Sequence, residues 1–176
     1  MIPFATAEPF DPPWYTVIGR ALHVDAPAIT RIIASAAPRT VPMNEADVRR
    51  RIHEFEVARR PDGRVVGTAA LRRLDRGRSE LRGLAIEPEA RGEGLGCRLA
   101  LRAMARAAIE HRRVLAVSVR PAFFEALGFT RTSLAEVPAK PERPILRAST
   151  PRIALVWLPP DEAAWASPAR SFGDAR

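Results

Sequence analysis

The chain has 176 residues, a length that suits one domain or one domain with short tails. Hydrophobic residues make up 47% and charged residues 27% of it, which predicts a full buried core. Charges interrupt every apolar stretch, so no run approaches the length of a membrane span. The N-terminus "MIPFATAEPFDPPWY" lacks the basic start and apolar segment of a secretion signal, and the single Cys97 excludes an internal disulfide framework. We therefore expect a cytoplasmic protein without membrane contacts.

The net charge of +8 is carried almost entirely by arginine. One interpretation is a polyanionic partner, either nucleic acid or a phosphate-rich cofactor. The other is GC-rich coding, since Ala, Arg and Pro are all abundant. The arginines are scattered rather than gathered in a block, and aromatic residues make up only 6% of the chain, too few for a nucleic-acid stacking surface. We expect no nucleic-acid partner.

The N-terminal third predicts one strand and two helices. The strand lies at 15–22, and helices follow at 24–36 and 44–55, where apolar residues recur at helical spacing. Asp25 and Asn44 stand where the N-caps of these helices should lie.

The middle of the chain predicts an antiparallel meander. Two strands, 54–60 and 64–74, flank the turn Pro61–Gly63, and a second turn, Asp75–Arg78, leads into a strand at 79–88.

The remaining elements are a long helix, a central apolar strand, a short helix, two strands and a Pro-interrupted loop. In chain order the helix is 94–111, with Leu95, Leu99, Ala103 and Ala107 inward, the strand 114–119, the short helix 121–128, and the last strands 129–134 and 152–159, with the loop at 138–151 between them. We expect one domain at 15–158, preceded by an irregular arm at 1–14 and followed by a loose tail at 159–176.

The segment "EARGEGLGCRL" places three glycines between a strand and the long helix. Phosphate-binding loops share this order of strand, glycine loop and helix. A P-loop is excluded because Cys97 and Arg98, rather than Lys and Ser or Thr, follow Gly96. A dinucleotide fingerprint is excluded because it needs a later third glycine and a βαβ unit, whereas a hairpin meander precedes this loop.

The run from Arg91 to Gly96 resembles the R/Q-x-x-G-x-G/A signature of the GNAT superfamily of acyl-CoA-dependent N-acyltransferases. Its glycines let main-chain amides close on a pyrophosphate at the positive end of the helix dipole. A glycine-rich turn that only packs strand against helix is the alternative, and the strand–loop–helix context favours the acyl-CoA site.

The resemblance extends from Val17 to Leu158 and includes "PAFFEALGF", which is similar to the "YEKLGF" element of the superfamily. Within it, the chain most resembles stand-alone amino-acid N-acetyltransferases of the N-acetylglutamate synthase kind. The resemblance implies an α+β fold, with a mixed, mostly antiparallel sheet of six to seven strands. About four helices would flank this sheet, which would splay between strands 4 and 5. It also implies acetyl-CoA as co-substrate, no metal, and a homodimer, which is common among relatives.

The implied reaction is direct attack of an amine on the thioester of acetyl-CoA. The backbone of Arg91, Gly92, Glu93, Gly94, Leu95 and Gly96 would hold the pyrophosphate. Leu84, Ala85 and Ile86 would pair with the pantetheine, and the N–H of Leu84 could polarise the thioester carbonyl. Phe124, with Phe123, could wall the thioester, although core packing explains both nearly as well.

Glu80 matches the position of the general-base glutamate in histone acetyltransferase relatives. A base is needed because only a neutral amine attacks. The alternative is a strand-end carboxylate paired with a neighbouring arginine. Phe124 replaces the tyrosine that usually protonates the leaving thiolate, and the only tyrosine, Tyr15, lies far away in sequence. A thiol with a pKa of about 8.5 can leave as the thiolate without an acid.

A glutamate-like acceptor carries carboxylates, for which arginine is the natural partner. Arg82 shares a strand face with Glu80 and is the strongest candidate. Arg39 follows the first helix, and Arg120, with Ser118, lies at the exit of the central strand. A solvated arginine remains the alternative for each. The histidines lack metal-ligand spacing, so no metal is expected.

The sequence thus predicts an acetyltransferase for a small amine, with an amino acid such as glutamate first. Another small amine, a non-catalytic acyl-CoA sensor and a basic nucleic-acid binder remain as alternatives.

Overall fold

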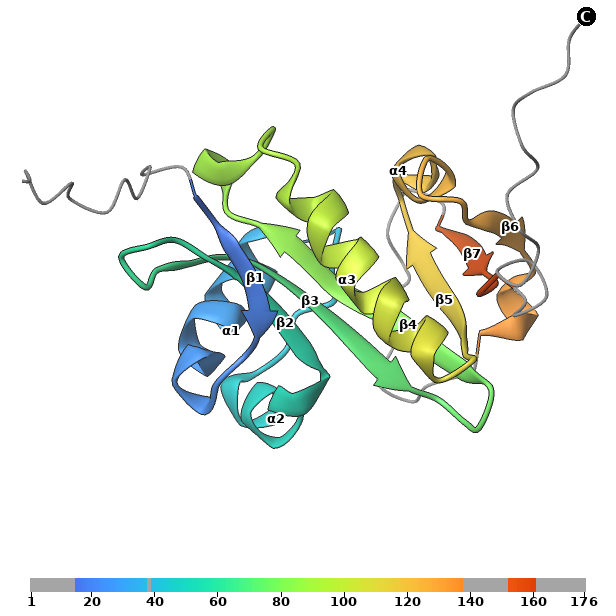
Figure 1. Ribbon diagram of the computed structural model, residues 1–176, viewed down its shortest axis with the longest axis horizontal. Helices are drawn as coiled ribbons and strands as arrows, with labels where there is room; N and C mark the ends of the chain where they lie inside the picture. The colour runs from blue at the N-terminus through green and yellow to red at the C-terminus, as the bar shows by residue number, and fades with distance from the viewer. Residues whose placement is uncertain (1–14, 38, 138–151, 161–176) are drawn as a thin grey trace, which may run out of the picture.

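A computed structural model describes residues 15–37, 39–137 and 152–160. These residues form one seven-stranded sheet with the spatial order β1-β2-β3-β4-β5-β7-β6 (Figure 1). The strands are β1 Val17–Arg20, β2 Phe55–Arg59, β3 Val65–Arg73, β4 Arg78–Ile86, β5 Arg113–Ser118, β6 Thr130–Thr132 and β7 Ile153–Trp157. Every neighbouring pair is antiparallel except β4 and β5. The predicted mixed, mostly antiparallel α+β fold is confirmed.

Helices cover both faces of the sheet (Figure 1). Among the described residues the α-helices are α1 Ala26–Ser35, α2 Glu45–Arg50, α3 Leu95–Ile109 and α4 Pro121–Glu125. Single 3-10 turns lie at His23–Asp25, Ile52–Glu54, Pro88–Ala90 and Leu134–Glu136. α1 and α2 share one hydrophobic cluster with the sheet, whereas α3 and α4 belong to a second cluster. None of the described helices has the length and apolar character to cross a bilayer.

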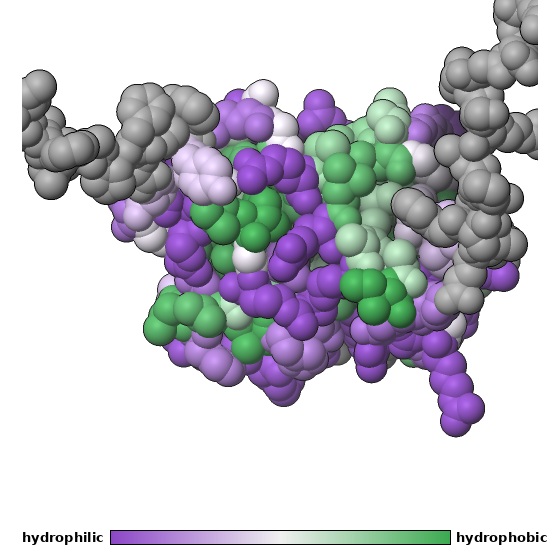
Figure 2. All heavy atoms as spheres, viewed as in Figure 1, coloured by the Kyte–Doolittle hydropathy of each residue, from purple (hydrophilic) through white to green (hydrophobic). Residues whose placement is uncertain are grey.

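The apolar periodicity of both long helices is confirmed by burial. In α1, Ile29, Ile32 and Ile33 are at most 1% exposed. In α3, Leu95 and Leu99 are at most 2% exposed, and each such leucine contributes about 1.5–3 kcal/mol relative to an exposed one. The alanines predicted to face inward, Ala103 and Ala107, are buried as well. The visible face around α3 is hydrophilic with separate apolar patches rather than one continuous apolar surface (Figure 2).

The second helix is shorter than predicted. Asn44 caps it as expected, because its side chain accepts a hydrogen bond of 2.7 Å from the N–H of Asp47. The helix ends at Arg50, and a 3-10 turn leads into β2 at Phe55. Phe55 is fully buried and pairs with Ala70 of β3, so it belongs to the predicted strand 54–60 and not to the overlapping end of the predicted helix.

Several predictions fall on residues that the structure does not describe. The arm at 1–14, the loop at 138–151 and residues 161–176 of the tail lie outside the described ranges. The domain boundaries at residues 15 and 158 therefore stay predictions.

The sheet opens between its two parallel strands. β4 and β5 pair only over Arg78–Leu81 and Arg113–Ala116. Beyond Ala116, β5 continues to pair with β7, while 82–86 of β4 pair with β3 alone among the described residues. The predicted splay between strands 4 and 5 is confirmed, and it leaves one backbone edge of β4 open.

A β-bulge lies where β4 leaves β5. Thr68 pairs with Ala85 and Ala70 pairs with Arg82, so β4 holds one residue more than β3 between these pairs. Gly83 lies in this interval with φ of +59°, a left-handed conformation that glycine adopts without a steric cost. Bulges of this kind bend a strand and increase its twist, which here turns β4 away from its neighbour.

We expect Gly83→Ala to destabilise the fold by about 1–2 kcal/mol, because alanine is strained in the left-handed region. A Cβ at this position would also lie 3.3 Å from the Ile33 side chain. Urea unfolding measures the effect. The matched control is Gly19→Ala in β1, where a Cβ meets no atom within 4 Å and φ is not positive. Equal stability of the two variants would contradict a strained bulge.

Candidate active site

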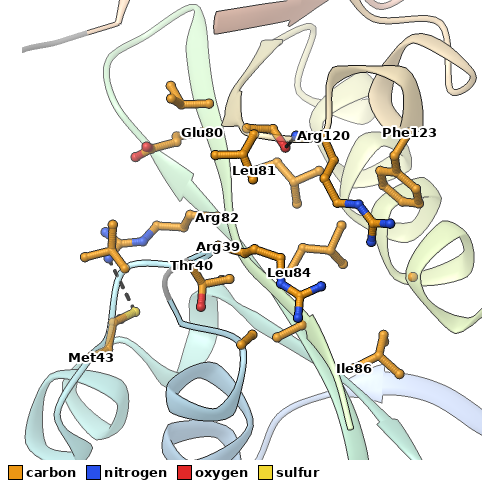
Figure 3. A pocket seen from close by; sticks show the side chains of 18 of the residues that line it. Arg39, Thr40, Met43, Glu80, Leu81, Arg82, Leu84, Ile86, Arg120 and Phe123 are labelled. Atoms are coloured by element: carbon orange, nitrogen blue, oxygen red, sulfur yellow. Dashed lines mark hydrogen bonds between the residues drawn. The ribbon is translucent and has the colours of Figure 1, made fainter. Parts of the chain in front are cut away.

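A cavity of about 690 Å³ occupies the opening between β4 and β5 (Figure 3). Its walls come from β4, the end of β5, the segment between α1 and α2, the first turn of α3, and α4. The predicted site residues that line it are Arg39, Glu80, Arg82, Leu84, Ala85, Ile86, Arg91, Gly96, Ser118, Arg120 and Phe124. The splayed sheet therefore brings together residues that are up to 85 positions apart in the chain, from Arg39 to Phe124.

The open edge of β4 forms one wall of this cavity. Leu84 and Ile86 are partly buried against the cluster that contains α3, whereas Ala85 belongs to the cluster on the α1 face. All three line the cavity. Because this part of β4 lacks a strand partner on the β5 side, its main chain is available to an extended ligand.

The glycine loop presents a set of main-chain donors. Among the described residues, the N–H groups of 92–97 have no hydrogen-bond partner, and the first helical bond runs from the Arg98 N–H to the Gly94 carbonyl at 3.1 Å. Gly92 and Gly94 have φ of +89° and +74°. A Cβ on either would meet no atom of the described residues within 4 Å, so the space beside these two glycines is open. Donors at a helix N-terminus without a filling side chain fit the pyrophosphate of a CoA thioester.

Two side chains of the loop point away from the cavity. Glu93 binds Arg60 of the β2–β3 turn at 2.6 Å, and this hydrogen bond raises the pKa of the Arg60 guanidinium. Leu95 is 2% exposed and belongs to the core. Only the backbone of these two residues, together with that of Gly92 and Gly94, is suited to a ligand.

Arg91 and Gly96 are the residues of the glycine loop that line the cavity. Arg91 donates from Nε to the Ile86 carbonyl at 3.3 Å, so it bridges the end of β4 and the loop. A Cβ on Gly96 would lie 3.8 Å from the ring of Phe123, which places this ring over the first turn of α3.

Glu80 is a buried carboxylate on the cavity wall, with 5% of the residue exposed. It pairs across the sheet with Arg72 of β3 on one side and with Leu115 of β5 on the other. Arg82 also lines the cavity, as expected for a residue two positions along the same strand (Figure 3).

The Arg82 guanidinium is partly buried. Burial lowers its pKa, and the negative charge of Glu80 opposes this shift. It stays charged at physiological pH because an arginine pKa lies far above 7. Its Nη2 donates to Sδ of Met43 at 3.3 Å.

Arg39 and Arg120 are exposed and lie at the mouth of the cavity. Arg39 points toward the stretch of β4 that contains Leu84 and Ile86, and Arg120 points toward Phe123 (Figure 3). Ser118 accepts a hydrogen bond of 2.9 Å from the Arg120 N–H, so it also shapes the turn after β5.

Phe124 lies deeper than Phe123 and is 8% exposed. Its ring packs edge to face against Phe123 at 5.1 Å and against Phe129 at 5.4 Å. Tyr15 does not replace the missing tyrosine, because it lies in a separate groove beside Val17.

Sequence reasoning missed several lining residues. They are Thr40, Val41, Met43, Asn44, Asp47, Arg51 and Arg152, from the α1–α2 segment, α2 and the start of β7. Asn44 is marked in the sequence only as a helix cap, and Arg51 and Arg152 are not distinguished from the many other arginines of the chain. The cavity is lined by six arginines, including Arg51 and Arg152, against the two acidic residues Asp47 and Glu80. Within the described ranges, no cluster of three or more His, Cys, Asp or Glu could hold a metal ion.

A family model described as an acetyltransferase (GNAT) domain matches residues 51–131. The amino-acid acetyltransferase of Mycobacterium tuberculosis is 32% identical over 118 residues, which cover 65% of this chain and 68% of that protein. The chain belongs to the GNAT acetyltransferases. It is therefore an acetyl-CoA-dependent acetyltransferase, and the resemblance seen in its glycine loop is confirmed.

Solved structures agree with this assignment. Rv2747 from Mycobacterium tuberculosis, in complex with CoA and NLQ, matches this acetyltransferase with a TM-score of 0.69 and 25% identity over 81% of this chain and 98% of that chain. N-acetylglutamate synthase from Neisseria gonorrhoeae, complexed with coenzyme A and N-acetyl-glutamate, matches with a TM-score of 0.72 and 24% identity over 82% of this chain and 35% of that chain. This second likeness shows the fold.

We expect Gly94→Ala to weaken CoA binding by roughly 5- to 30-fold. Alanine at φ of +74° costs about 1–2 kcal/mol, and the loop must recover the strained conformation to present its N–H groups. Isothermal titration calorimetry with CoA measures the change. Gly77→Ala is the control, because a Cβ there meets no atom within 4 Å and φ is not positive. Unchanged CoA affinity in Gly94→Ala would contradict a role for this loop.

Proposed function

We propose that this acetyltransferase acetylates the amine of an amino acid, with glutamate as the first candidate, by direct attack in a ternary complex. The observation that carries the proposal is a buried carboxylate, Glu80, beside the open edge of β4 in a cavity rich in arginine. The 32% identity to an amino-acid acetyltransferase supports the acceptor class.

The co-substrate half of the site uses main-chain groups. The N–H groups from Gly92 to Gly96 bind the pyrophosphate, whereas the Arg91 N–H donates to the Pro88 carbonyl at 3.3 Å. Residues 84–86 of β4 pair with the pantetheine. The bulge beside Gly83 turns the chain at Leu84, whose N–H then polarises the thioester carbonyl. Phe123 and Phe124 form the apolar wall of the acyl site.

Glu80 is the general base of the proposed reaction. It takes a proton from the ammonium of the acceptor, directly or through one water, because only the neutral amine attacks the thioester carbon. The carbon–sulfur bond then breaks and CoA leaves as its thiolate. A thiol pKa of about 8.5 makes this departure feasible without the tyrosine that Phe124 replaces.

Arginine side chains provide the acceptor half of the site. Arg82 lies on the same strand as Glu80, and Arg39 and Arg120 stand at the mouth of the cavity (Figure 3). Carboxylates of an amino acid are natural partners for these guanidinium groups. Another small amine remains the second candidate, because the α1–α2 segment that lines the acceptor half shows no motif for a single acceptor. Homodimerisation stays a prediction.

A thiol-release assay with acetyl-CoA and a panel of amines tests this function. We expect turnover with L-glutamate to exceed that with L-lysine and L-arginine, because the cavity carries an excess of positive charge. We expect Glu80→Gln to lower kcat by about 10²- to 10⁴-fold, the usual contribution of a general base.

The matched control is Glu89→Gln, since Glu89 is exposed and does not line the cavity. Full activity of Glu80→Gln would exclude Glu80 as the base. Turnover only with amines that lack a carboxylate would replace the amino acid by the second candidate.

A further inference from the structure

Arg82 has an uncharged hydrogen-bond partner, unlike two other partly buried arginines, Arg59 and Arg106. Arg106 binds the carboxylate of Glu56 at 3.0 Å, and Arg59 binds that of Asp25 at 2.7 Å. In the described part of the chain, Arg82 has no carboxylate within ion-pair distance, and its recorded hydrogen bond runs to the thioether of Met43 at 3.3 Å. The fold therefore neutralises some guanidinium groups but not this one.

Met43 is held firmly in the cavity wall. It is 9% exposed and packs in the cluster of α1 and α2, immediately before the capping residue Asn44. A thioether sulfur is a weak, uncharged hydrogen-bond acceptor. It can therefore fix the direction of the Arg82 guanidinium without cancelling its charge.

Charges of both signs surround Arg82 without forming a direct ion pair with it in the described part of the chain. Glu80 and Glu54 attract it, whereas Arg72 and Arg51 repel it. In the proposed reaction, Glu80 interacts with the acceptor ammonium. A partly buried guanidinium in this setting gains most from a carboxylate, which can bind its fork through two parallel hydrogen bonds.

We propose that Met43 is a specificity-determining residue, which orients Arg82 toward the cavity and reserves its charge for a carboxylate of the acceptor. This inference rests on the proposed function and adds the feature by which the enzyme distinguishes its acceptors. An amine without that carboxylate leaves Arg82 unpaired and binds weakly, since a desolvated charge without a partner is costly. The carboxylate can be the α-carboxylate or one on the side chain of the acceptor.

Met43→Glu and Met43→Gln form the decisive pair, because the two side chains have the same size and differ in charge. Both are made in the full chain. We expect Met43→Glu to raise KM for L-glutamate by about 10- to 100-fold with little change in kcat, because an internal carboxylate occupies the fork. We expect Met43→Gln to keep KM within a few-fold, because its amide oxygen accepts the hydrogen bond and carries no charge.

Three acceptors, L-glutamate, L-glutamine and L-isoglutamine, identify the carboxylate that Arg82 recognises. L-glutamine lacks the side-chain carboxylate, and L-isoglutamine lacks the α-carboxylate. The compound that lacks the group bound by Arg82 should be a poor acceptor of the wild-type enzyme, and its KM should not respond to Met43→Glu. CoA affinity, measured in parallel, should be the same in both variants and the wild type, and a cooperative thermal transition shows that both variants fold.

The results separate this inference from the proposed function. Equal KM values for Met43→Glu and Met43→Gln, or equal use of all three acceptors by the wild type, overturn the role of Met43 and leave the acetyltransferase activity intact. Should the wild type acetylate none of the three, the proposed function fails. Calorimetric binding of L-glutamate to the CoA complex then decides the role of Met43, which stands only if Met43→Glu alone weakens this binding.

Discussion

The parting of two parallel strands is the constraint on which the rest of this structure depends. β4 and β5 share four paired residues each; beyond them, among the described residues, β5 pairs only with β7 and β4 only with β3. An unpaired backbone edge in a sheet is normally a liability, because its polar groups remain unsatisfied. Here the edge lines a cavity instead, so the same unsatisfied groups become a place for an extended substrate.

Two glycine features make this opening compatible with a well-packed core. Gly83 accepts the positive φ of the bulge, so β4 can bend without losing its pairing to β3. Gly92 and Gly94 keep the start of α3 free of side chains, while Leu95 and Leu99 anchor the same helix in the core. The N-terminus of α3 is therefore packed into the core on one side and open to a ligand on the other.

The distribution of charge separates structural from functional arginines. Arg59, Arg60 and Arg106 bind carboxylates and tie together elements that are distant in sequence. Arg82 instead faces the cavity with a neutral partner. A composition dominated by arginine conceals this difference, because it depends on which carboxylate each side chain reaches in the folded protein.

Local signals in the sequence predicted most of the elements, and the resemblance carried by the glycine loop predicted part of the site. The alternation around Glu80 and Arg82, the glycines from Arg91 to Gly96 and the Asn44 cap all act within a few residues, so their geometry follows from the sequence alone. Tertiary structure decided the rest: Phe55, where the predicted helix 44–55 and the predicted strand 54–60 overlap, joined the strand, and Met43 reached Arg82, 39 residues away. Such contacts depend on how distant elements pack, and no local periodicity encodes them.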